Sequence, residues 1–149
     1  MIHLHLKIKK VLGCEDLETP KFMTEGSVGM DIYAAVDGVV MIRSGERKLI
    51  PTGICLELPS GYECQVRPRS GLAIKHGVTL LNTPGTIDWD YRGEIKVIMI
   101  NLGEEDFTIN RGDRVAQIVF SKVEIPSIEV VKEISTTERG SGGFGSTGM

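Results

Sequence analysis

Two carboxylates stand close together in the stretch that runs from Asn82 to Glu94 and reads N-T-P-G-T-I-D-W-D-Y-R-G-E. Asp88 and Asp90 are candidates for a general base, because a carboxylate within hydrogen-bond distance of a water molecule can take its proton. An isolated D-x-D pattern is more typical of solvated aspartates in a hairpin. The other segments of the chain therefore decide whether this pair is catalytic.

The flanking residues predict how the pair is presented. Pro84-Gly85 is typical of a reversing turn, since proline presets φ at the second turn position and glycine accepts positive φ at the third. We expect a strand from Ile87 to Tyr91 after this turn. Its alternation would place Asp88 and Asp90 on one face, and the apolar side chains, including Trp89 and Tyr91, on the other.

A second candidate site surrounds P-R-S-G, from Pro68 to Gly71. Taken alone, this pattern is more typical of a turn that opens the short helical stretch from Leu72 to Lys75, which should end near Gly77. Backbone N–H groups at a helix start, together with the side chains of Arg69 and Ser70, can also bind an anion. A phosphate group would suit such a site.

The C-terminal segment from Thr136 to Met149 is rich in glycine and serine, which predicts a flexible tail. Gly143, Gly145 and Gly148 satisfy G-x-G-x-x-G, but no helix can follow them, so a dinucleotide-binding interpretation fails. Arg139 and Phe144 give this tail more chemistry than a linker has. An arginine and an aromatic ring can stack on a base while glycine N–H groups approach phosphates.

Five segments resemble, in order, the five motifs of the trimeric deoxyuridine triphosphatase (dUTPase) family. They are Gly29–Ala35 (G-M-D-I-Y-A-A), Pro68–Ala73 (P-R-S-G-L-A), Pro84–Glu94 (P-G-T-I-D-W-D-Y-R-G-E), Gly112–Phe120 (G-D-R-V-A-Q-I-V-F) and Arg139–Gly148 (R-G-S-G-G-F-G-S-T-G). Together they span most of the chain. The resemblance implies hydrolysis of dUTP to dUMP and pyrophosphate with Mg2+, which keeps uracil out of DNA and supplies dUMP for thymidylate synthesis.

The resemblance also implies a role for individual residues. Asp88 would be the general base for water attack on the α-phosphorus, and Asp31 would lie near the metal, with contact through water. Tyr91 would pack against the deoxyribose and exclude a 2′-hydroxyl, and the tail would close over the nucleotide as a lid. The implied substrate-binding residues are Arg69, Ser70, Gly71, Asn82, Gly85, Tyr91, Gln117, Arg139, Phe144, Gly145 and Ser146.

Members of the resembled family are homotrimers whose active sites combine the base-bearing segment of one chain with the tail of another. Two alternatives stay open at this point. A dCTP deaminase holds a similar nucleotide but reacts at the base, and this chain has no H-x-E with P-C-x-x-C of a zinc deaminase. A non-catalytic nucleotide sensor could use the same binding motifs.

Composition restricts the class of protein. The chain has 149 residues, 41% of them hydrophobic, which suits one domain with an ordinary core. Its net charge of −3 argues against general nucleic-acid binding. Cys14, Cys55 and Cys64 have no C-x-x-C spacing, so they favour reduced thiols. Since no apolar span suits a membrane, we expect a soluble, cytoplasmic protein.

Short alternating or apolar runs separated by turn residues predict an all-β sandwich or jelly roll with one short helix. We expect the β domain to cover residues 1–135 and a flexible lid segment to cover 136–149. The expected strands are 2–9, 29–35, 39–42, 48–50, 54–58, 62–67, 87–91, 95–100, 107–109 and 115–120, and residues 78–81 lead into the segment from Asn82 to Glu94.

Three further expectations concern this pattern. The run from Ile95 to Ile100 is almost continuously apolar and predicts a strand buried on both faces. His3 and His5 share the polar face of the first strand, where histidines without a third ligand are usually solvated. Arg111-Gly-Asp113 suits a turn better than a cell-adhesion motif.

Overall fold

The computed structural model describes residues 4–148, and nearly all of the regular structure in that range is β-strand. The strands are β1 (Lys7–Lys10), β2 (Met30–Tyr33), β3 (Val40–Ile42), β4 (Arg47–Glu57), β5 (Tyr62–Arg67), β6 (Val78–Leu80), β7 (Gly85–Ile87), β8 (Glu94–Asn101), β9 (Phe107–Ile109) and β10 (Arg114–Lys122). The helix α1 covers Ser70–His76. The all-β prediction with one short helix is confirmed.

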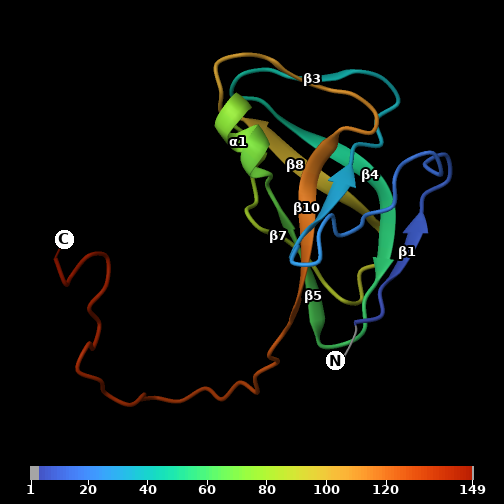
Figure 1. Ribbon diagram of the computed structural model, residues 1–149. Helices are drawn as coiled ribbons and strands as arrows, with labels where there is room; N and C mark the ends of the chain where they lie inside the picture. Colours follow the sequence, from blue (N-terminus) through green and yellow to red (C-terminus); the bar gives the residue numbers. More distant parts are fainter. Residues whose placement is uncertain (1–3, 149) are drawn as a thin grey trace.

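Two four-stranded sheets form the body of the molecule (Figure 1). One has the strand order β1-β4-β8-β6 and the other the order β2-β10-β5-β7, and β3 pairs with β9 in a separate ribbon. The pairings are antiparallel throughout this set. This arrangement is the jelly-roll-like sandwich that the short strands predict.

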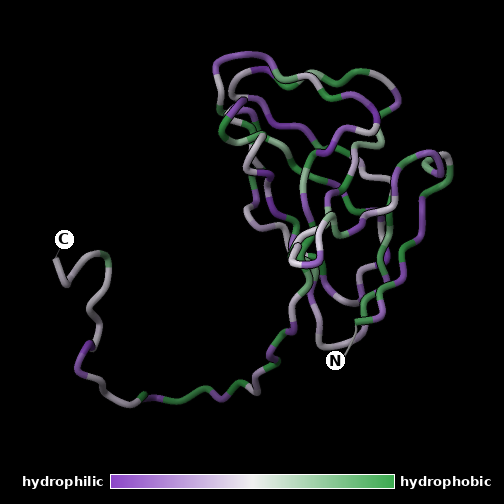
Figure 2. The backbone as a smooth tube through the Cα atoms, in the orientation of Figure 1, coloured by the Kyte–Doolittle hydropathy of each residue, from purple (hydrophilic) through white to green (hydrophobic). Residues whose placement is uncertain are grey.

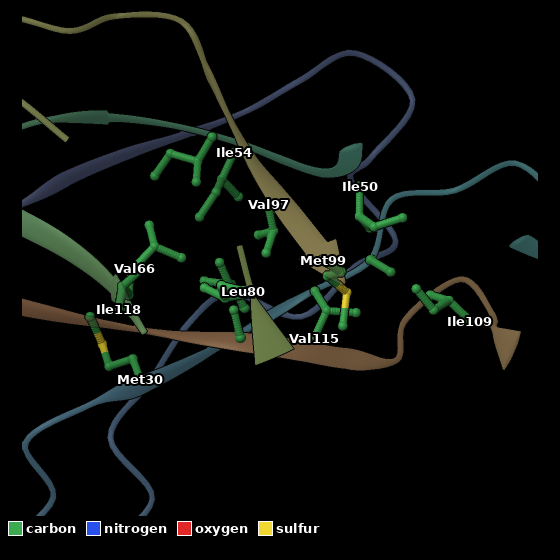
Figure 3. Close-up of a cluster of buried hydrophobic side chains, with 14 of the residues drawn as sticks. Met30, Ile50, Ile54, Val66, Leu80, Val97, Met99, Ile109, Val115 and Ile118 are labelled. Carbon is green, nitrogen blue, oxygen red and sulfur yellow. The ribbon is translucent and has the colours of Figure 1, made fainter. Parts of the chain in front are cut away.

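The core lies between the sheets and takes alternate residues from both of them. Ile118 and Val66 come from the β10-containing sheet, while Val97 and Met99 come from β8 of the other sheet, and all are buried. Figure 3 shows these side chains pointing into a common apolar interior. The core therefore fixes which face of each strand is left for polar contacts.

The prediction of two separate strands at 48–50 and 54–58 is wrong, because both belong to the single strand β4. Instead of ending, the strand continues through a register shift between Pro51 and Cys55. Thr52 is buried there and donates its hydroxyl to the carbonyl of Ile95 at 2.5 Å. Gly53 has a φ of 70° and can take the left-handed conformation that the irregularity needs. The turn-like composition thus marks a bulge within one long strand.

The turn at Pro59–Gly61 lies between the predicted strands 54–58 and 62–67, and this order of strand, turn and strand predicts a hairpin. It reverses the chain, but β4 and β5 do not pair: β5 pairs with β10 and β7 in the other sheet. Cys64 and Val66 alternate inward as predicted. The alternation identified the strand but not its neighbour, because a turn can also carry the chain between sheets.

Three expectations for residues 84–100 are also wrong. The strand β7 ends at Ile87, and residues from Asp88 to Tyr91 form a turn closed by the N–H of Tyr91 on the carbonyl of Asp88 at 3.1 Å. Gly85 lies inside β7 without positive φ, so it does not occupy the predicted turn position. Within β8, Lys96 is exposed and Ile98 half-buried, so this strand is buried on one face only.

Other expectations are confirmed. The helix ends at Gly77, which has a φ of 65°, and Arg111–Asp113 forms a turn. Exposure alternates along residues 4–10, although the strand itself is shorter than predicted, and His5 is exposed as expected. The expectations for Ile2 and His3 fall outside the described residues. No helix in the 4–148 range has the length and hydropathy to cross a bilayer.

The chain leaves the body after β10. The N–H of Val123 still donates to the carbonyl of Gly61 at 2.9 Å. Beyond it, residues 124–148 form no strand or helix and run away from the sandwich (Figure 1). Figure 2 shows apolar stretches in the first part of this arm and mostly weakly polar chain near its end, where the sequence is rich in glycine.

Candidate functional site

Sheet order brings three of the predicted site residues together. In the order β2-β10-β5, Gln117 of β10 lies opposite Asp31 of β2 on one side and Arg67 of β5 on the other. Arg69 follows β5 by two residues, and its Nε donates to Oδ1 of Asp31 at 2.9 Å. Gln117 donates its Nε2 to the carbonyl of Pro68 at 3.0 Å. Residues far apart in sequence thus share one polar cluster.

Asp31 is the charged centre of this cluster. Its other oxygen, Oδ2, lies 3.5 Å from Nη1 of Arg114, and the carbonyl of Arg114 accepts a hydrogen bond from Arg69 at 3.4 Å. Sequence reasoning missed Arg114. A signal was available, because Arg114 begins the strand that carries Gln117 and follows a turn. Both carboxylate oxygens of Asp31 therefore face guanidinium groups.

The remaining members of this group lie beside Arg69. Ser70 and Gly71 begin α1 directly after it, and the Ser70 residue is exposed. The backbone of Gly29 packs closely on Gln117: a Cβ built on Gly29 would lie 3.2 Å from Cδ of Gln117 and would overlap its Oε1. We call Asp31, Arg69, Ser70, Gly71 and Gln117 the Arg69 group.

A second group of predicted residues surrounds β7. The amide of Asn82 lies over Gly85, 3.4 Å from where a Cβ on that glycine would be. Asp88 follows the last residue of β7 and lines a cavity of about 330 Å³ with its neighbours Thr86 and Ile87. Tyr91, Glu94 and Lys96 complete the lining. We call this the Asp88 cavity.

Tyr91 lies in this cavity wall rather than on the far face of a strand from Asp88, as the sequence had predicted. The turn that follows β7 is the physical reason, because it ends the alternation of side chains after Ile87. Tyr91 donates its hydroxyl to the carbonyl of Glu94 at 3.0 Å. Trp89 lies in the same turn and is 41% exposed. Four lining residues were not predicted as part of the site: Thr86, Ile87, Glu94 and Lys96.

The two groups are separate within this chain. Among the residues described, no hydrogen bond or ion pair joins Asp88 or Tyr91 to the Arg69 group, and the Asp88 cavity has no lining residue from it. The single chain thus offers a cationic cluster and a carboxylate cavity at different places.

The predicted tail residues contact neither group in this structure. Arg139 donates its Nε to the carbonyl of Gly142 at 2.8 Å, and the N–H of Ser146 donates to the carbonyl of Gly143 at 3.0 Å. The Phe144 ring is fully exposed. These contacts are local turns within the arm, which projects away from the body (Figure 1).

Electrostatics near Asp31 extends to Tyr33 on the same strand. This side chain is buried and donates its hydroxyl to Oε2 of Glu18 at 2.7 Å. Burial, and then the hydrogen bond and negative charge of Glu18, raise the pKa of Tyr33 to about 12. Tyr33 is therefore a neutral donor at physiological pH that attaches the segment before β2 to the sheet.

Metal ligation by protein groups alone has little support. No group of three or more histidine, cysteine, aspartate or glutamate side chains within residues 4–148 is arranged to hold a metal ion. The guanidinium groups beside both oxygens of Asp31 oppose direct ligation there. Magnesium, however, usually keeps several waters and binds through substrate phosphates with few carboxylates.

Known proteins resemble the chain over most of its length. Deoxyuridine 5'-triphosphate nucleotidohydrolase of Caldanaerobacter subterraneus is 58% identical over 144 residues, which cover 97% of each chain. The Staphylococcus bacteriophage 80alpha dUTPase with dUPNHPP superposes with a TM-score of 0.87 at 25% identity, covering 97% of this chain and 99% of that one.

A further structure shares the fold. A point mutant of the dUTPase from the S. aureus phage phi11 has a TM-score of 0.79 at 22% identity over 89% of this chain and 99% of that one, and its description concerns coordination of a structural Mg(II) ion. The dUTPase family model matches residues 15–148. The chain therefore belongs to the dUTPase family.

Proposed function

We propose that this protein hydrolyses dUTP to dUMP and pyrophosphate, and that Asp88 is the general base. Family membership over residues 15–148 carries the reaction. The observation that supports Asp88 as the general base is its position in a cavity of about 330 Å³ at the end of β7. A carboxylate in such a cavity can hold a water molecule and remove its proton during attack on phosphorus, which is worth roughly 10²–10⁴-fold in rate.

The Arg69 group would bind the triphosphate. Arg69 supplies a planar set of N–H donors, and Ser70 and the N–H of Gly71 can add hydrogen bonds. Gln117 has its Nε2 on the carbonyl of Pro68, which fixes the amide beside Arg69. Asp31 orients the guanidinium through its 2.9 Å hydrogen bond, so that the cation is held in place before the anion arrives.

Mg2+ is the metal we assign to this reaction. Its chemistry when bound would be to spread the negative charge of the triphosphate. Asp31 would approach it through water, in agreement with the guanidinium groups that face both of its carboxylate oxygens. The residues present thus fit a metal held mainly by substrate phosphates and water.

The uracil base and the deoxyribose of dUTP would be recognised by residues around β7. The side chain of Asn82 and the backbone from Asn82 to Gly85 present fixed donors and acceptors that can distinguish uracil from cytosine. Tyr91 would pack against the deoxyribose and leave no space for a 2′-hydroxyl. Both ideas agree with the way Asn82 lies over Gly85 and Tyr91 lines the Asp88 cavity.

We further propose a homotrimer with shared active sites. The separation of the Asp88 cavity from the Arg69 group within one chain supports this. In a trimer, the Arg69 group of one copy can complete the Asp88 cavity of its neighbour. The projecting arm supports it as well. Residues 136–149 would form a lid in which Arg139, Phe144, Gly145 and Ser146 contact nucleotide, and residues 1–135 would form the catalytic domain.

A panel of nucleoside triphosphates assayed for pyrophosphate release with Mg2+ tests the function. We expect turnover of dUTP and little turnover of UTP, dCTP or dTTP. Ammonia release from dCTP would instead identify a deaminase, and tight dUTP binding without any product would identify a nucleotide sensor. In cells, the proposed reaction would keep uracil out of DNA and supply dUMP for thymidylate synthesis. We propose that the enzyme acts in the cytoplasm, where it would meet the nucleotide pool.

A further inference from the structure

The side chain of Tyr91 is 44% exposed, so core packing does not hold it in place. Its ring lies instead on the backbone of Gly93. A Cβ built on Gly93 would lie 2.6 Å from Cζ of the ring, which is closer than real Cβ contacts, and 3.0 Å from Cε2, which is tighter than most of them. Gly93 has no positive φ, so alanine could adopt its backbone conformation. The missing side chain at Gly93 therefore makes space for one specific group, the Tyr91 ring.

Two hydrogen bonds fix the ends of the same residue. The N–H of Tyr91 donates to the carbonyl of Asp88 at 3.1 Å, and its hydroxyl donates to the carbonyl of Glu94 at 3.0 Å. Arg92 also donates its Nη1 to the carbonyl of Trp89 at 2.7 Å. The turn from Asp88 to Glu94 is thus closed by its own polar groups around Tyr91.

Glu94 connects this turn to the sheet. Its Oε1 accepts the N–H of Gly53 at 3.0 Å, and Gly53 lies buried in the bulge of β4. The Glu94 side chain is only 22% exposed, and its Oε2 lies 4.0 Å from the ammonium of Lys96. The carbonyl that accepts the Tyr91 hydroxyl therefore belongs to a residue fixed on two neighbouring strands.

We propose that Gly93 and Glu94 form a platform that holds the Tyr91 ring in the wall of the Asp88 cavity, and that both are positioning residues for the choice of deoxyribose over ribose. This inference rests on the proposed function, in which Tyr91 excludes the 2′-hydroxyl. Neither residue touches the reacting atoms. Each acts through Tyr91, whose half-exposed ring depends on this platform for its position in the cavity wall.

A double-mutant cycle tests the platform. We expect Gly93→Ala to push the ring aside and to raise the ratio of kcat/KM for UTP to that for dUTP by roughly tenfold. In a Tyr91→Ala background the same glycine change should leave the ratio unaltered, because no ring remains to be displaced. If Gly93→Ala shifted the ratio equally in both backgrounds, the platform would be refuted.

The matched control is Gly38→Ala. Gly38 also lacks positive φ, and a Cβ built on it would meet nothing within 4 Å. This variant should keep the wild-type ratio and rate. A general loss of folding in Gly93→Ala would lower the rates on dUTP and UTP together, leave the ratio unchanged and count against the proposal.

Two further variants separate the parts of the platform. Tyr91→Phe keeps the ring on Gly93 but loses the hydroxyl bond, so its ratio of kcat/KM values should rise less than in Gly93→Ala, by roughly threefold, in line with one hydrogen bond. Glu94→Gln keeps an acceptor for Gly53 and should retain the ratio, whereas Glu94→Ala should not. The dUTP turnover of the wild type reports on the proposed function itself, independently of these ratios.

Discussion

The Nε of Arg69 donates to Oδ1 of Asp31 at 2.9 Å across a gap of 38 residues in the sequence, and both side chains are largely buried. The strands β2 and β5 that lead to these residues do not pair with each other, because β10 lies between them. The pair therefore joins the two neighbours of the central strand and fixes a cation beside Gln117.

Asp31→Asn tests what this pair does. The change keeps the side-chain size but leaves the guanidinium groups of Arg69 and Arg114 without their carboxylate. We expect a loss of about 1–3 kcal/mol in the free energy of unfolding, measured in urea, with a higher KM for dUTP. Asp37→Asn, at an exposed position, is the control and should change neither quantity. Wild-type stability and KM in Asp31→Asn would show that the pair is not needed to fix Arg69.

Asp88→Asn keeps the shape of the proposed base but loses its basicity. We expect nucleotide binding to persist while kcat falls by roughly 100-fold or more. Asp90→Asn is the matched control, since Asp90 lies two residues away, is exposed and does not line the cavity. A near-normal kcat in Asp88→Asn would remove the base assignment.

Gly29→Ala should disturb Gln117 without touching the nucleotide. The added methyl would overlap Oε1 of Gln117 and turn the amide away from the carbonyl of Pro68. We expect a higher KM for dUTP with a smaller effect on kcat. At Gly26 a Cβ meets nothing within 4 Å, so Gly26→Ala should behave as wild type. Equal kinetics of the two variants would mean that Gln117 has no part in binding.

The pKa of Tyr33, raised to about 12 from 10.0, predicts how stability responds to alkaline pH. A folded-state pKa above the unfolded value means that the neutral hydroxyl contributes stability fully below pH 10 and loses it as pH rises through 12. Unfolding free energies of wild type and Tyr33→Phe, measured across this window, should therefore converge. Parallel curves would contradict the buried hydrogen bond to Glu18.

Shared sites can be tested by mixing two inactive variants, Asp88→Ala and a chain that ends before Arg139. Unfolded and refolded together in equal amounts, they should recover about a quarter of wild-type activity, because about three-quarters of trimers are mixed and each has one complete site in three. Each variant alone is the control. Zero recovery from well-mixed trimers would place base and tail in the same chain.

The sequence predicted most strands because inward alternation repeats at every second residue, as in Cys64 and Val66. It could not predict which strands pair, since the turn at Pro59–Gly61 looks the same whether it closes a hairpin or changes sheets. Nor could it locate the end of β7. Polar and apolar residues alternate in the sequence through Asp90, which predicts a longer strand. In the structure, the N–H of Tyr91 donates to the carbonyl of Asp88 and closes a turn there.

The site shows the same limit. Motif resemblance identified Asp31, Arg69 and Gln117 individually, and the strand order explains why they meet. Arg114 and Glu94 were missed as site residues. Arg114 contacts Asp31 of β2, and Glu94 accepts the N–H of Gly53 in β4, so both contacts depend on which strands pair. The sequence therefore identified residues within the motifs, whereas the residues that contact and position them could be found only once the strand pairing was known.

The central place of β10 has a consequence for how the protein is made. As the last strand in the chain, it lies between β2 and β5, which come from the first half of the sequence. A ribosome therefore finishes most of the polypeptide while these two strands still present unpaired edges. Such long-range pairing folds slowly, and open edges can pair with other nascent chains. We therefore expect the nascent chain to need chaperones until Arg114–Lys122 has been synthesised and can pair with both strands.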